Sequence, residues 1–517
     1  MNVPERIDLT QKQMAALLAR AKRLLPEEDY KIIKAMADTI SFLSRSVGKK
    51  NAHIQKLLAM LFGTVTEKTS KVLKERKVKR SEKKEPEGHG RNGASSYSGA
   101  QKIKIPNRTL KPKDRCPVCK KGKVYDTAKP GVIVRITGQS PLAAKVYELE
   151  RLRCNLCGRV FTAKAPESVG DEKYDSASGA MTALLKYGTG LPFNRLERLQ
   201  ASLGVPLPAS TQWEIVESVA DRIAPVYREL AREAAQGDII HNDDTVMKIL
   251  SQINLPDEER KGRKGMFTSG FMSVAGDIKI ALFLTGHNHA GENMAEILAK
   301  RSDSLGPPIQ MCDGLSRNIP KDFKTILANC IAHGRRKFVE VNESFPRECG
   351  YVLKTLEKVY INDAYTKEKE MDPEQRLKYH QDNSAELMED LKTWLTSQLN
   401  DKNVEPNSSL GQAISYMLKH FKGMTLFLRV PKAPLDNNLC EQVLKKAILH
   451  RKNSLFYKTE HGAYIGDLFM SLIHTCSLCR ANPFEYLKTL QEHSSAVSKN
   501  PGKWMPWNYE EMLHPVA

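Results

Sequence analysis

Long apolar runs are missing from this sequence, and no stretch approaches the roughly 20 consecutive apolar residues that a helix needs to cross a bilayer. The first residues, Met1-Asn-Val-Pro-Glu5, form neither a basic-then-apolar secretory signal nor an Arg-rich transit peptide. We therefore expect no membrane partner and a chain that stays in the cytosol.

Cysteine is also scarce, with ten in 517 residues. Four of them form two C-x-x-C pairs, Cys116-Pro-Val-Cys119 and Cys154-Asn-Leu-Cys157. In a reducing compartment this pattern indicates a metal site rather than disulfides. Alternating residues at 131–137 and 145–153 predict a β-hairpin between the pairs, which would complete a zinc ribbon with one structural Zn²⁺. A third pair, Cys476 and Cys479, lies in an apolar helical stretch without a matching pair, so we expect buried thiols there.

Acidic residues are too few to balance the basic ones: 60 Asp and Glu stand against 80 Lys and Arg, giving a formal net charge of +20. A soluble chain this basic usually meets a polyanion, because each Lys or Arg set against a phosphate releases counterions. Residues 68–84 alone carry nine Lys or Arg against two Glu, and a Gly/Ser-rich stretch follows. We interpret this segment as a solvated linker that also grips DNA phosphates.

A heptad pattern precedes the linker, formed by Ile33, Ile40, Val47, Ile54 and Leu61. The alternate positions hold Met36, Leu43 and Leu57, and Lys50 interrupts that row. About four heptads are enough to predict a coiled coil that joins two chains. The alternative is one amphipathic helix that packs within its own chain.

A helix, a short turn and a second helix are predicted between the cysteine pairs and the next region. The first helix covers residues 192–203, Gly204-Val-Pro206 turns, and Ser210 and Thr211 begin the second helix, which contains Trp213. This is the outline of a DNA-binding helix-turn-helix, although any two core helices can share it.

Short strands begin after Gly237. Three of them, residues 238–250, 266–274 and 278–284, should be antiparallel, and shorter ones at 308–314 and 326–332 alternate with helices. This order is that of a ribonuclease-H-like α/β fold. The 127 residues between Asp313 and Glu441 exceed what that fold requires, and the helix-prone stretches at 348–370 and 373–399 predict a helical insertion.

Three carboxylates stand where such a fold would bring them together. Asp243 lies within the first strand beside Asp244, Asp313 ends the fourth strand, and residues 436–438 are N-cap types that place Glu441 in the first turn of a helix. Hard oxygen ligands suit Mg²⁺ or Mn²⁺, and two such ions can activate an attacking oxygen and stabilise a leaving one.

Several motifs resemble one family of proteins. His241-Asn-Asp-Asp-Thr245, Cys330-Ile-Ala-His-Gly-Arg-Arg-Lys-Phe338, Leu435-Asp-Asn-Asn-Leu-Cys-Glu441 and His450-Arg-Lys-Asn453 closely resemble transposases of the insertion sequence 66 (IS66) family. The double C-x-x-C also follows that family's order, so the resemblance covers nearly the whole chain. The departures are mild: Gly334 stands where alanine is usual, and Cys440 and Gln442 flank Glu441.

The resemblance implies a DDE transposase whose catalytic acids are Asp243, Asp313 and Glu441, with two Mg²⁺ or Mn²⁺ ions per active site. Asp244 is the alternative first ligand. His333 would contact the scissile phosphate, and the alternative for it is a core histidine. The residues expected to contact DNA are Arg335, Arg336, Lys337, Lys445, Arg451 and Lys452.

The resemblance also implies partners. These are the terminal inverted repeats of the element and target DNA, a second copy of the chain at least, and the small accessory proteins often encoded beside family members. A bacterial cytoplasmic, nucleoid-associated protein is expected. The competing hypothesis is a non-catalytic, domesticated, sequence-specific DNA-binding protein.

The expected organisation is a multidomain α+β protein. Its predicted parts are a helical, coiled-coil dimerisation region at 1–67, a basic flexible linker at 68–110, a zinc ribbon at 111–170, a helical DNA-binding domain at 171–232, the first part of the catalytic domain at 233–344, a helical insertion at 345–430, the second catalytic part at 431–495, and a tail at 496–517.

The heptad pattern predicts that a fragment covering residues 1–67 self-associates. Charged residues in place of Ile40 and Ile54 should abolish the association, because the buried charges would have no partners. Sedimentation of the fragment measures this, and a native fragment that stays monomeric would show that the apolar stripe packs internally.

Overall fold

The computed structural model describes residues 11–37, 69–73, 102–107, 109–125, 139–157, 159–169, 172–253 and 265–513, together with residues 133, 134 and 136. It divides into two compact units. The larger unit comprises Met1–Glu75, Glu172–Arg195 and Ala209–Ala517, and the smaller comprises Arg76–Asp171 and Leu196–Pro208. The heptad beyond residue 37 and residues 74–101 of the predicted linker lie outside the described residues.

A five-stranded mixed sheet forms the centre of the larger unit, in the order β5-β4-β3-β6-β7. β3 (Ile239–Val246), β4 (Phe267–Ala275) and β5 (Ile278–Gly286) are antiparallel, whereas β6 (Ile309–Cys312) and β7 (Ile326–Asn329) run parallel to β3. Gly276 turns β4 into β5 with a φ of +57°. The five strands predicted for this region are confirmed, but β3 ends at Val246 rather than at residue 250, and β7 ends at Asn329 rather than at residue 332.

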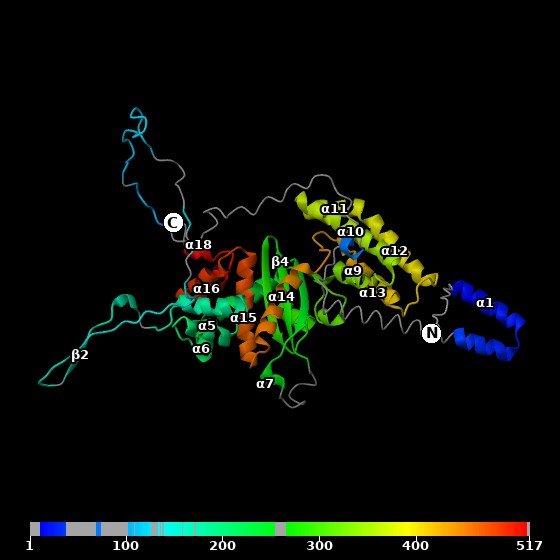
Figure 1. The fold of residues 1–517 in the computed structure, drawn as a ribbon, viewed down its shortest axis with the longest axis horizontal. Helices are drawn as coiled ribbons and strands as arrows, with labels where there is room; N and C mark the ends of the chain where they lie inside the picture. The colour runs from blue at the N-terminus through cyan, green and yellow to red at the C-terminus, as the bar shows by residue number, and fades with distance from the viewer. Residues whose placement is uncertain are drawn as a thin grey trace, which may run out of the picture. The chain divides into compact units, whose positions relative to one another are not determined.

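Helices packed against both faces of the sheet form its larger apolar core with it. They are α4 (Ser176–Ala183), the π-helix Leu184–Gly188, α6 (Ala209–Ala235), α8 (Ala290–Leu298), α14 (Asn438–Ser454), α15 (Glu460–Leu478) and α16 (Pro483–Glu492). Figure 1 shows α14 and α15 running alongside β4. The buried stripe of α6 repeats at helical spacing, through Val216, Ile223 and Leu230, and Tyr227 donates a hydrogen bond to the carbonyl of Phe283 at 3.1 Å.

The predicted pair of helices around Gly204 is confirmed as α5 (Phe193–Ser202) and α6, and Gly204 has a φ of +76°. Because most of one face of α6 is buried in the core, this long helix supports the sheet. Contact of the pair with DNA stays a prediction. No helix in the described part of the chain is long and apolar enough to cross a bilayer.

The outer edge of β5 is closed by side chains of α15. Asp467, Ser471 and Thr475, spaced four residues apart on one face of the helix, accept hydrogen bonds from the backbone N–H groups of Thr285, Phe283 and Ala281. Cys479, the next residue of the series, donates to the carbonyl of Lys279 at 3.7 Å. An edge strand usually leaves such groups open to other chains, and here the helix satisfies them. Cys476 is buried, as expected, and Cys479 is half-buried.

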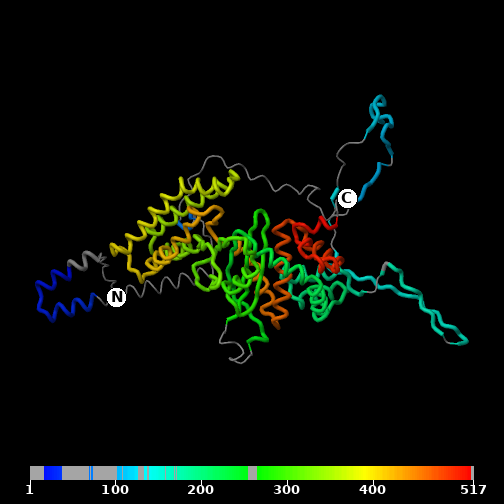
Figure 2. Tube along the Cα trace, turned by 180° about the vertical axis from the view of Figure 1, so that it is seen from behind, coloured from blue at the N-terminus to red at the C-terminus, as the bar shows by residue number. Residues whose placement is uncertain are grey.

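Helices α9 (Ile331–Val341), α10 (Pro346–Glu368), α11 (Pro373–Asn383), α12 (Ala385–Asn400) and α13 (Ser409–Met424) gather beside the β6–β7 side of the sheet. Both ribbon views show this group together (Figures 1 and 2). The predicted helical stretch at 373–399 breaks at Ser384, between α11 and α12. Residues of β6 and β7, including Met311 and Ala328, share one apolar core with Leu353, Leu391 and Ile414 of these helices.

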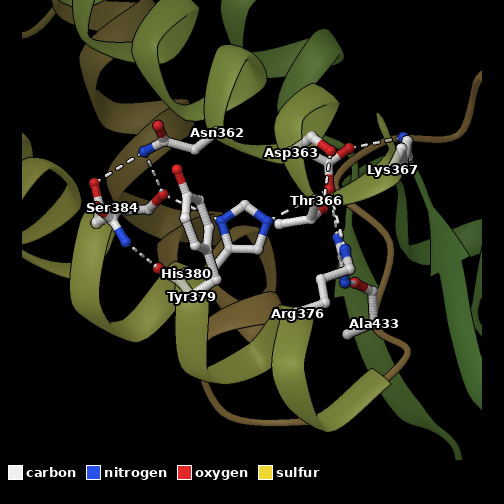
Figure 3. Close-up of polar contacts among 10 residues, drawn as sticks. Asn362, Asp363, Thr366, Lys367, Arg376, Tyr379, His380, Ser384 and Ala433 are labelled. Atoms are coloured by element: carbon white, nitrogen blue, oxygen red, sulfur yellow. Dashed lines mark hydrogen bonds and ion pairs between the residues drawn. The ribbon is translucent and has the colours of Figure 1, made fainter. Parts of the chain in front are cut away.

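A buried polar cluster fastens the helical group to the segment before α14 (Figure 3). Asp363 of α10 accepts hydrogen bonds from Arg376 at 2.8 and 3.0 Å. It also forms an ion pair with Lys367 at 2.6 Å. Arg376 also donates to the carbonyl of Ala433 at 3.0 Å. Burial by itself raises the pKa of Asp363, but hydrogen bonds from His380 and Lys367 and the charge of Arg376 outweigh it and hold this pKa well below its usual range.

Two predicted flexible segments contain ordered structure. Within the predicted linker, Thr69–Val72 forms α3, where Thr69 is buried and Val72 accepts a hydrogen bond from Asn342. Within the predicted tail, α17 (Ser494–Lys499), a 3-10 turn at Pro501–Trp504 and α18 (Tyr509–Leu513) bury Val497, Trp504 and Met505 against the core that contains α6. The remaining N-terminal helices are α1 (Gln11–Leu24) and a helical run at residues 27–37.

Each C-x-x-C pair of the smaller unit lies in a tight turn. Gly122 donates its N–H to Cys119 Sγ at 3.4 Å, and Cys157 donates to Cys154 Sγ at 3.5 Å. The observed hairpin, β1 (Arg151–Arg153) with β2 (Val160–Thr162), brackets the second pair. The predicted strands at 131–137 and 145–150 are therefore wrong wherever those residues are described, because the pairing begins only at Arg151.

Zinc binding stays a prediction, because the described residues include no group of three or more His, Cys, Asp or Glu side chains close enough to hold a metal ion. The sulfur-directed N–H groups fit thiolate ligands, and they lower the pKa of Cys119. We expect one Zn²⁺ per chain by metal analysis. Cys154→Ser should lose the metal and loosen residues 115–158 to proteolysis, since structural zinc supplies much of a small module's folding free energy. An unchanged zinc content in the variant would contradict this.

Candidate active site

Asp243 and Asp313 occupy equivalent positions on neighbouring parallel strands. His241 of β3 pairs with Met311 of β6, and each aspartate lies two residues further along. Asn318, in the 3-10 turn Ser316–Asn318, joins the two carboxylates: its amide nitrogen donates to Asp313 Oδ1 at 2.6 Å and to Asp243 Oδ1 at 3.4 Å. The expectation that these two acids lie together is therefore met by the geometry.

Two ionised carboxylates at this distance repel each other. Burial, and next the charge of Asp313, raise the pKa of Asp243 to about 7, although the backbone N–H of Asp244 donates to it at 2.8 Å. A shift of this size means that the folded chain resists placing both charges there unless positive charge accompanies them.

Asp244 belongs to a different arrangement. Its side chain, 1% exposed, pairs with Arg317 at 3.1 Å and with His289 at 3.0 Å. Both of its carboxylate oxygens are therefore engaged by cationic or hydrogen-bonding groups of the protein, whereas Asp243 faces Asp313.

The turn that carries Arg317 and Asn318 is fixed against the sheet. The carbonyl of Asn318 accepts hydrogen bonds from the buried side chains of Asn242 and Gln310, both at 2.7 Å. A Cβ atom on Gly291 of α8 would lie 2.5 Å from the carbonyl oxygen of Ile319, so α8 packs directly on the end of this turn. Sequence reasoning missed Asn318, since nothing in its spacing distinguishes it from other polar loop residues.

Glu441 lies in the first turn of α14, as predicted. This helix approaches the sheet closely at Gly270 of β4, the residue paired with Asp243. A Cβ on Gly270 would meet Leu444 at 2.8 Å, and Cys440 Sγ donates to the Gly270 carbonyl at 3.2 Å. The small residue on β4 thus allows the start of α14 to lie at the level of Asp243.

Asn437 begins α14, but its side chain does not cap the helix as the sequence suggested. Its amide donates to the Asn242 carbonyl at 3.2 Å, its Oδ1 lies 3.1 Å from His241 Nδ1, and its backbone N–H donates to Cys330 Sγ at 3.2 Å. Burial lowers the pKa of His241 to about 4, so this ring is neutral at pH 7. Asn437 therefore ties the helix that bears Glu441 to β3 and to the start of α9.

The carboxylate of Glu441 faces α9. Its Oε1 lies 3.6 Å from Arg336 Nη2 and 3.9 Å from His333 Nε2. This oxygen is buried and makes no hydrogen bond within the described part of the chain, and the same holds for Asn318 Oδ1. His333 thus lies beside the third acid, and its contact with a scissile phosphate stays a prediction.

Buried oxygens that make no hydrogen bond within the described part of the chain, together with the Asp243–Asp313 pair, fit a divalent cation that prefers hard oxygen ligands. Among the described residues, no three acids are yet within reach of a single ion. Asp243 and Asp313, the two acids that Asn318 joins, could hold such an ion, and Glu441 lies at the start of α14, which packs on β4.

The residues expected to bind DNA fall into two groups. Lys445 and Lys452 are exposed, and Arg336 and Lys337 are half-buried. Arg451 donates to Thr245 Oγ1 and to the Val246 carbonyl, which fastens the end of α14 to β3. Arg335 is 8% exposed and donates to Thr69 Oγ1 at 3.3 Å, so it cannot reach a phosphate without leaving that place.

Comparison with known proteins identifies the family. Residues 174–465, more than half of the chain, match the sequence model described as Transposase IS66 family. The chain belongs to this family. The matched region contains Asp243, Asp313 and Glu441, and the family's DDE-type chemistry implies DNA as a partner and the use of divalent metal.

Three relatives come from Sinorhizobium fredii (strain NBRC 101917 / NGR234). The uncharacterized proteins y4hP, y4jD and y4qI are 25%, 26% and 22% identical to this chain. The similarity covers 67%, 70% and 64% of this chain, and it spans 65%, 71% and 62% of the respective relatives.

The raised pKa of Asp243 predicts a pH-dependent response to metal. A carboxyl whose folded pKa is raised destabilises the folded state as pH rises from about 4 to 7, because the unfolded chain ionises first. A cation that binds the ionised pair offsets this loss. We expect Mg²⁺ or Mn²⁺ to raise the thermal unfolding temperature by several degrees at pH 8 and much less at pH 5.5.

Asp243→Asn should remove the metal response. Asp467→Asn is the matched control, since burial also raises the pKa of Asp467 to about 7, but its partner is Thr285 of β5. That variant should keep the full response to Mg²⁺. If Asp243→Asn is stabilised by Mg²⁺ as strongly as the native chain, the metal binds elsewhere.

Proposed function

We propose that this protein is an active DNA transposase that binds the ends of an insertion sequence and catalyses strand cleavage and strand transfer. Asp243, Asp313 and Glu441 would hold two Mg²⁺ or Mn²⁺ ions. The observation that supports this best is the pair of carboxylates joined by Asn318, with Glu441 on the helix that packs against the partner residue of Asp243.

The sheet supports the same proposal through its topology. Three antiparallel strands followed by two parallel ones, in the order β5-β4-β3-β6-β7, is the arrangement expected of a ribonuclease-H-like catalytic domain. In it Asp243 lies on the central strand and Asp313 follows the adjacent one, while the helices α10–α13 form the predicted insertion.

We assign the first ligand to Asp243 rather than Asp244. Arg317 and His289 already bond to the two carboxylate oxygens of Asp244, and the pairing with Arg317 anchors the turn containing Asn318. Asn318 of this turn donates a hydrogen bond to Asp313, so Asp244 acts as a positioning residue.

Several side chains near Glu441 would have separate roles at the scissile phosphodiester. His333, 3.9 Å from Glu441, is placed to hydrogen-bond a phosphate oxygen beside that acid, and Arg336 supplies positive charge there. Divalent cations, when bound, supply the charge that stabilises the attacking and leaving oxygens. Asn437 and Gly270 keep the third acid at the level of the first. Cleavage frees a 3′-hydroxyl, which then attacks a target phosphodiester.

Other parts of the chain would serve DNA capture and assembly. The exposed Lys445 and Lys452 on α14 would follow the DNA backbone. The heptad region would join at least two chains, the zinc ribbon and the helices around Gly204 would contact element ends, and small accessory proteins of the same element would take part.

Alanine at Asp243, Asp313 or Glu441 should leave binding of labelled element ends unchanged or slightly tighter, because a carboxylate repels phosphate when no metal is present. Strand cleavage should fall by several orders of magnitude, since charge stabilisation by the metals carries most of the rate enhancement. Binding and cleavage are measured on the same variants with Mg²⁺, Mn²⁺ and Ca²⁺.

Asp244→Ala is the matched control within the pair, and its loss of activity should be milder because it disturbs only the turn. Normal cleavage by Asp243→Ala together with an inactive Asp244→Ala would reverse the assignment. Native binding without cleavage under any metal would favour the non-catalytic DNA-binding protein instead.

A further inference from the structure

The helical insertion contributes side chains to the immediate surroundings of Asp313. Tyr416 and His420 lie one turn apart on α13 and face the Asp313–Gly314 dipeptide. The backbone N–H of Gly314 donates to the hydroxyl of Tyr416 at 3.3 Å. A Cβ on Gly314 would lie 2.6 Å from His420 Nε2, so the imidazole rests directly against this glycine.

The rings form a small layered group with a cation. The centroids of Tyr416 and His420 are 4.7 Å apart, and Lys337 of α9 places its ammonium 4.5 Å from the centroid of the Tyr416 ring. All three side chains are half-buried. The imidazole of His420 makes no hydrogen bond to any residue that the structure describes, so its ring N–H remains available to a ligand.

The placement of α13 is rigid at both ends of this group. Met417 and Met424 pack on Gly334 of α9, where a Cβ would meet their methyl carbons at 3.1 and 2.9 Å. At Gly423 a Cβ would lie 2.1 Å from Asn329 Oδ1, and Asn329 itself donates to the Asp313 carbonyl at 3.3 Å. The glycine that departs from the family pattern thus brings α13 close to α9 beside the acid.

The charge of this surface suits an anion. α13 has no Asp or Glu and carries Lys419 next to His420, and α9 contributes Lys337 and Arg336 on the same side as His333. A half-open surface with an unused imidazole, an ammonium and backbone-anchored tyrosine beside a metal-binding carboxylate suits a phosphodiester better than a protein side chain.

We propose that His420, Tyr416 and Lys337 form a subsite for the sugar-phosphate backbone of the DNA strand next to the scissile bond, with His420 donating to a phosphate oxygen. This rests on the proposed function, and it makes α13 of the insertion part of the active site. The strand belongs either to the element end or to target DNA, which share this chemistry.

Replacing single DNA phosphates by uncharged groups tests the contact between His420 and a phosphate without requiring catalysis. Duplexes of the element end, and separately of target DNA, carry a single methylphosphonate at each phosphate near the cut or joining point. Binding is measured with Ca²⁺. We expect one position in one duplex where neutralisation weakens binding by the native chain about ten- to a hundredfold, the range of one charge-assisted hydrogen bond.

His420→Ala should bind the unmodified duplex about as weakly as the native chain binds the duplex with that methylphosphonate. The affinity of His420→Ala should not fall further when the methylphosphonate is introduced. His420→Gln, which keeps an N–H donor, should recover part of the affinity. Lys422→Ala is the control: it removes a charge from α13 about 200° around the helix from His420, so it should keep the native sensitivity. Unfolding temperatures of the variants establish that all are folded.

The outcomes separate this subsite from the proposed activity. Equal sensitivity of native and His420→Ala chains at every phosphate of both duplexes would overturn the subsite, as would failure of the native chain to bind either duplex. If His420→Ala loses the sensitivity to one methylphosphonate as expected, but the native chain does not cleave DNA in Mg²⁺, the subsite is supported and the proposed catalysis is contradicted. If His420→Ala does not fold, Lys337→Gln must show the same loss of sensitivity at a neighbouring phosphate.

Discussion

Two carboxylates of like charge, Asp243 and Asp313, are held at matching positions on adjacent parallel strands, and much of the surrounding structure serves this placement. Burial and mutual repulsion raise the free energy of the ionised pair, as the raised pKa of Asp243 indicates. The side-chain amide of Asn318 donates to both acids, and the backbone carbonyl of Asn318 accepts hydrogen bonds from the side chains of Asn242 and Gln310. An arrangement that is unfavourable by itself persists because the hydrogen bonds around it leave the acids no alternative position.

The third acid comes from a helix far along the chain, so its position depends on tertiary contacts alone. Gly270 lets α14 approach β4, and Asn437 binds the start of that helix to β3 and Cys330. On the far edge of the sheet, Asp467, Ser471 and Thr475 of α15 bond to β5. The helices that follow the insertion therefore brace the sheet from its outer edge to the strand that carries Asp243.

Local sequence patterns predicted the five strands of the central sheet and the first-turn place of Glu441, because residue alternation and the residue types at a helix start act over a few residues. They also suggested Asp243, within the first strand, and Asp313, at the end of the fourth. Asn318 and His420 could not be found this way, since each acquires its role from a chain segment distant in sequence. The C-terminal residues were expected to be a tail because their helices are short and polar, yet Trp504 and Met505 complete the core against α6. Arg335 shows the reverse error, because a basic run does not reveal which of its members faces inward.

The helical group α10–α13 is better understood as part of the unit that holds the three acids than as an appendage. Its helices share one apolar core with Met311 of β6 and Ala328 of β7, so removing them would expose the strands that position Asp313. Arg376 extends from the buried carboxylate of Asp363 to the Ala433 carbonyl, four residues before Asn437. A displacement of α11 would therefore be felt at the start of α14, while a displacement of α13 would be felt at Gly314. Both acids outside the central strand are thus positioned through the insertion. This dependence explains how 127 residues can separate Asp313 from Glu441 while the site stays defined, because the intervening chain is itself the support that relates the two.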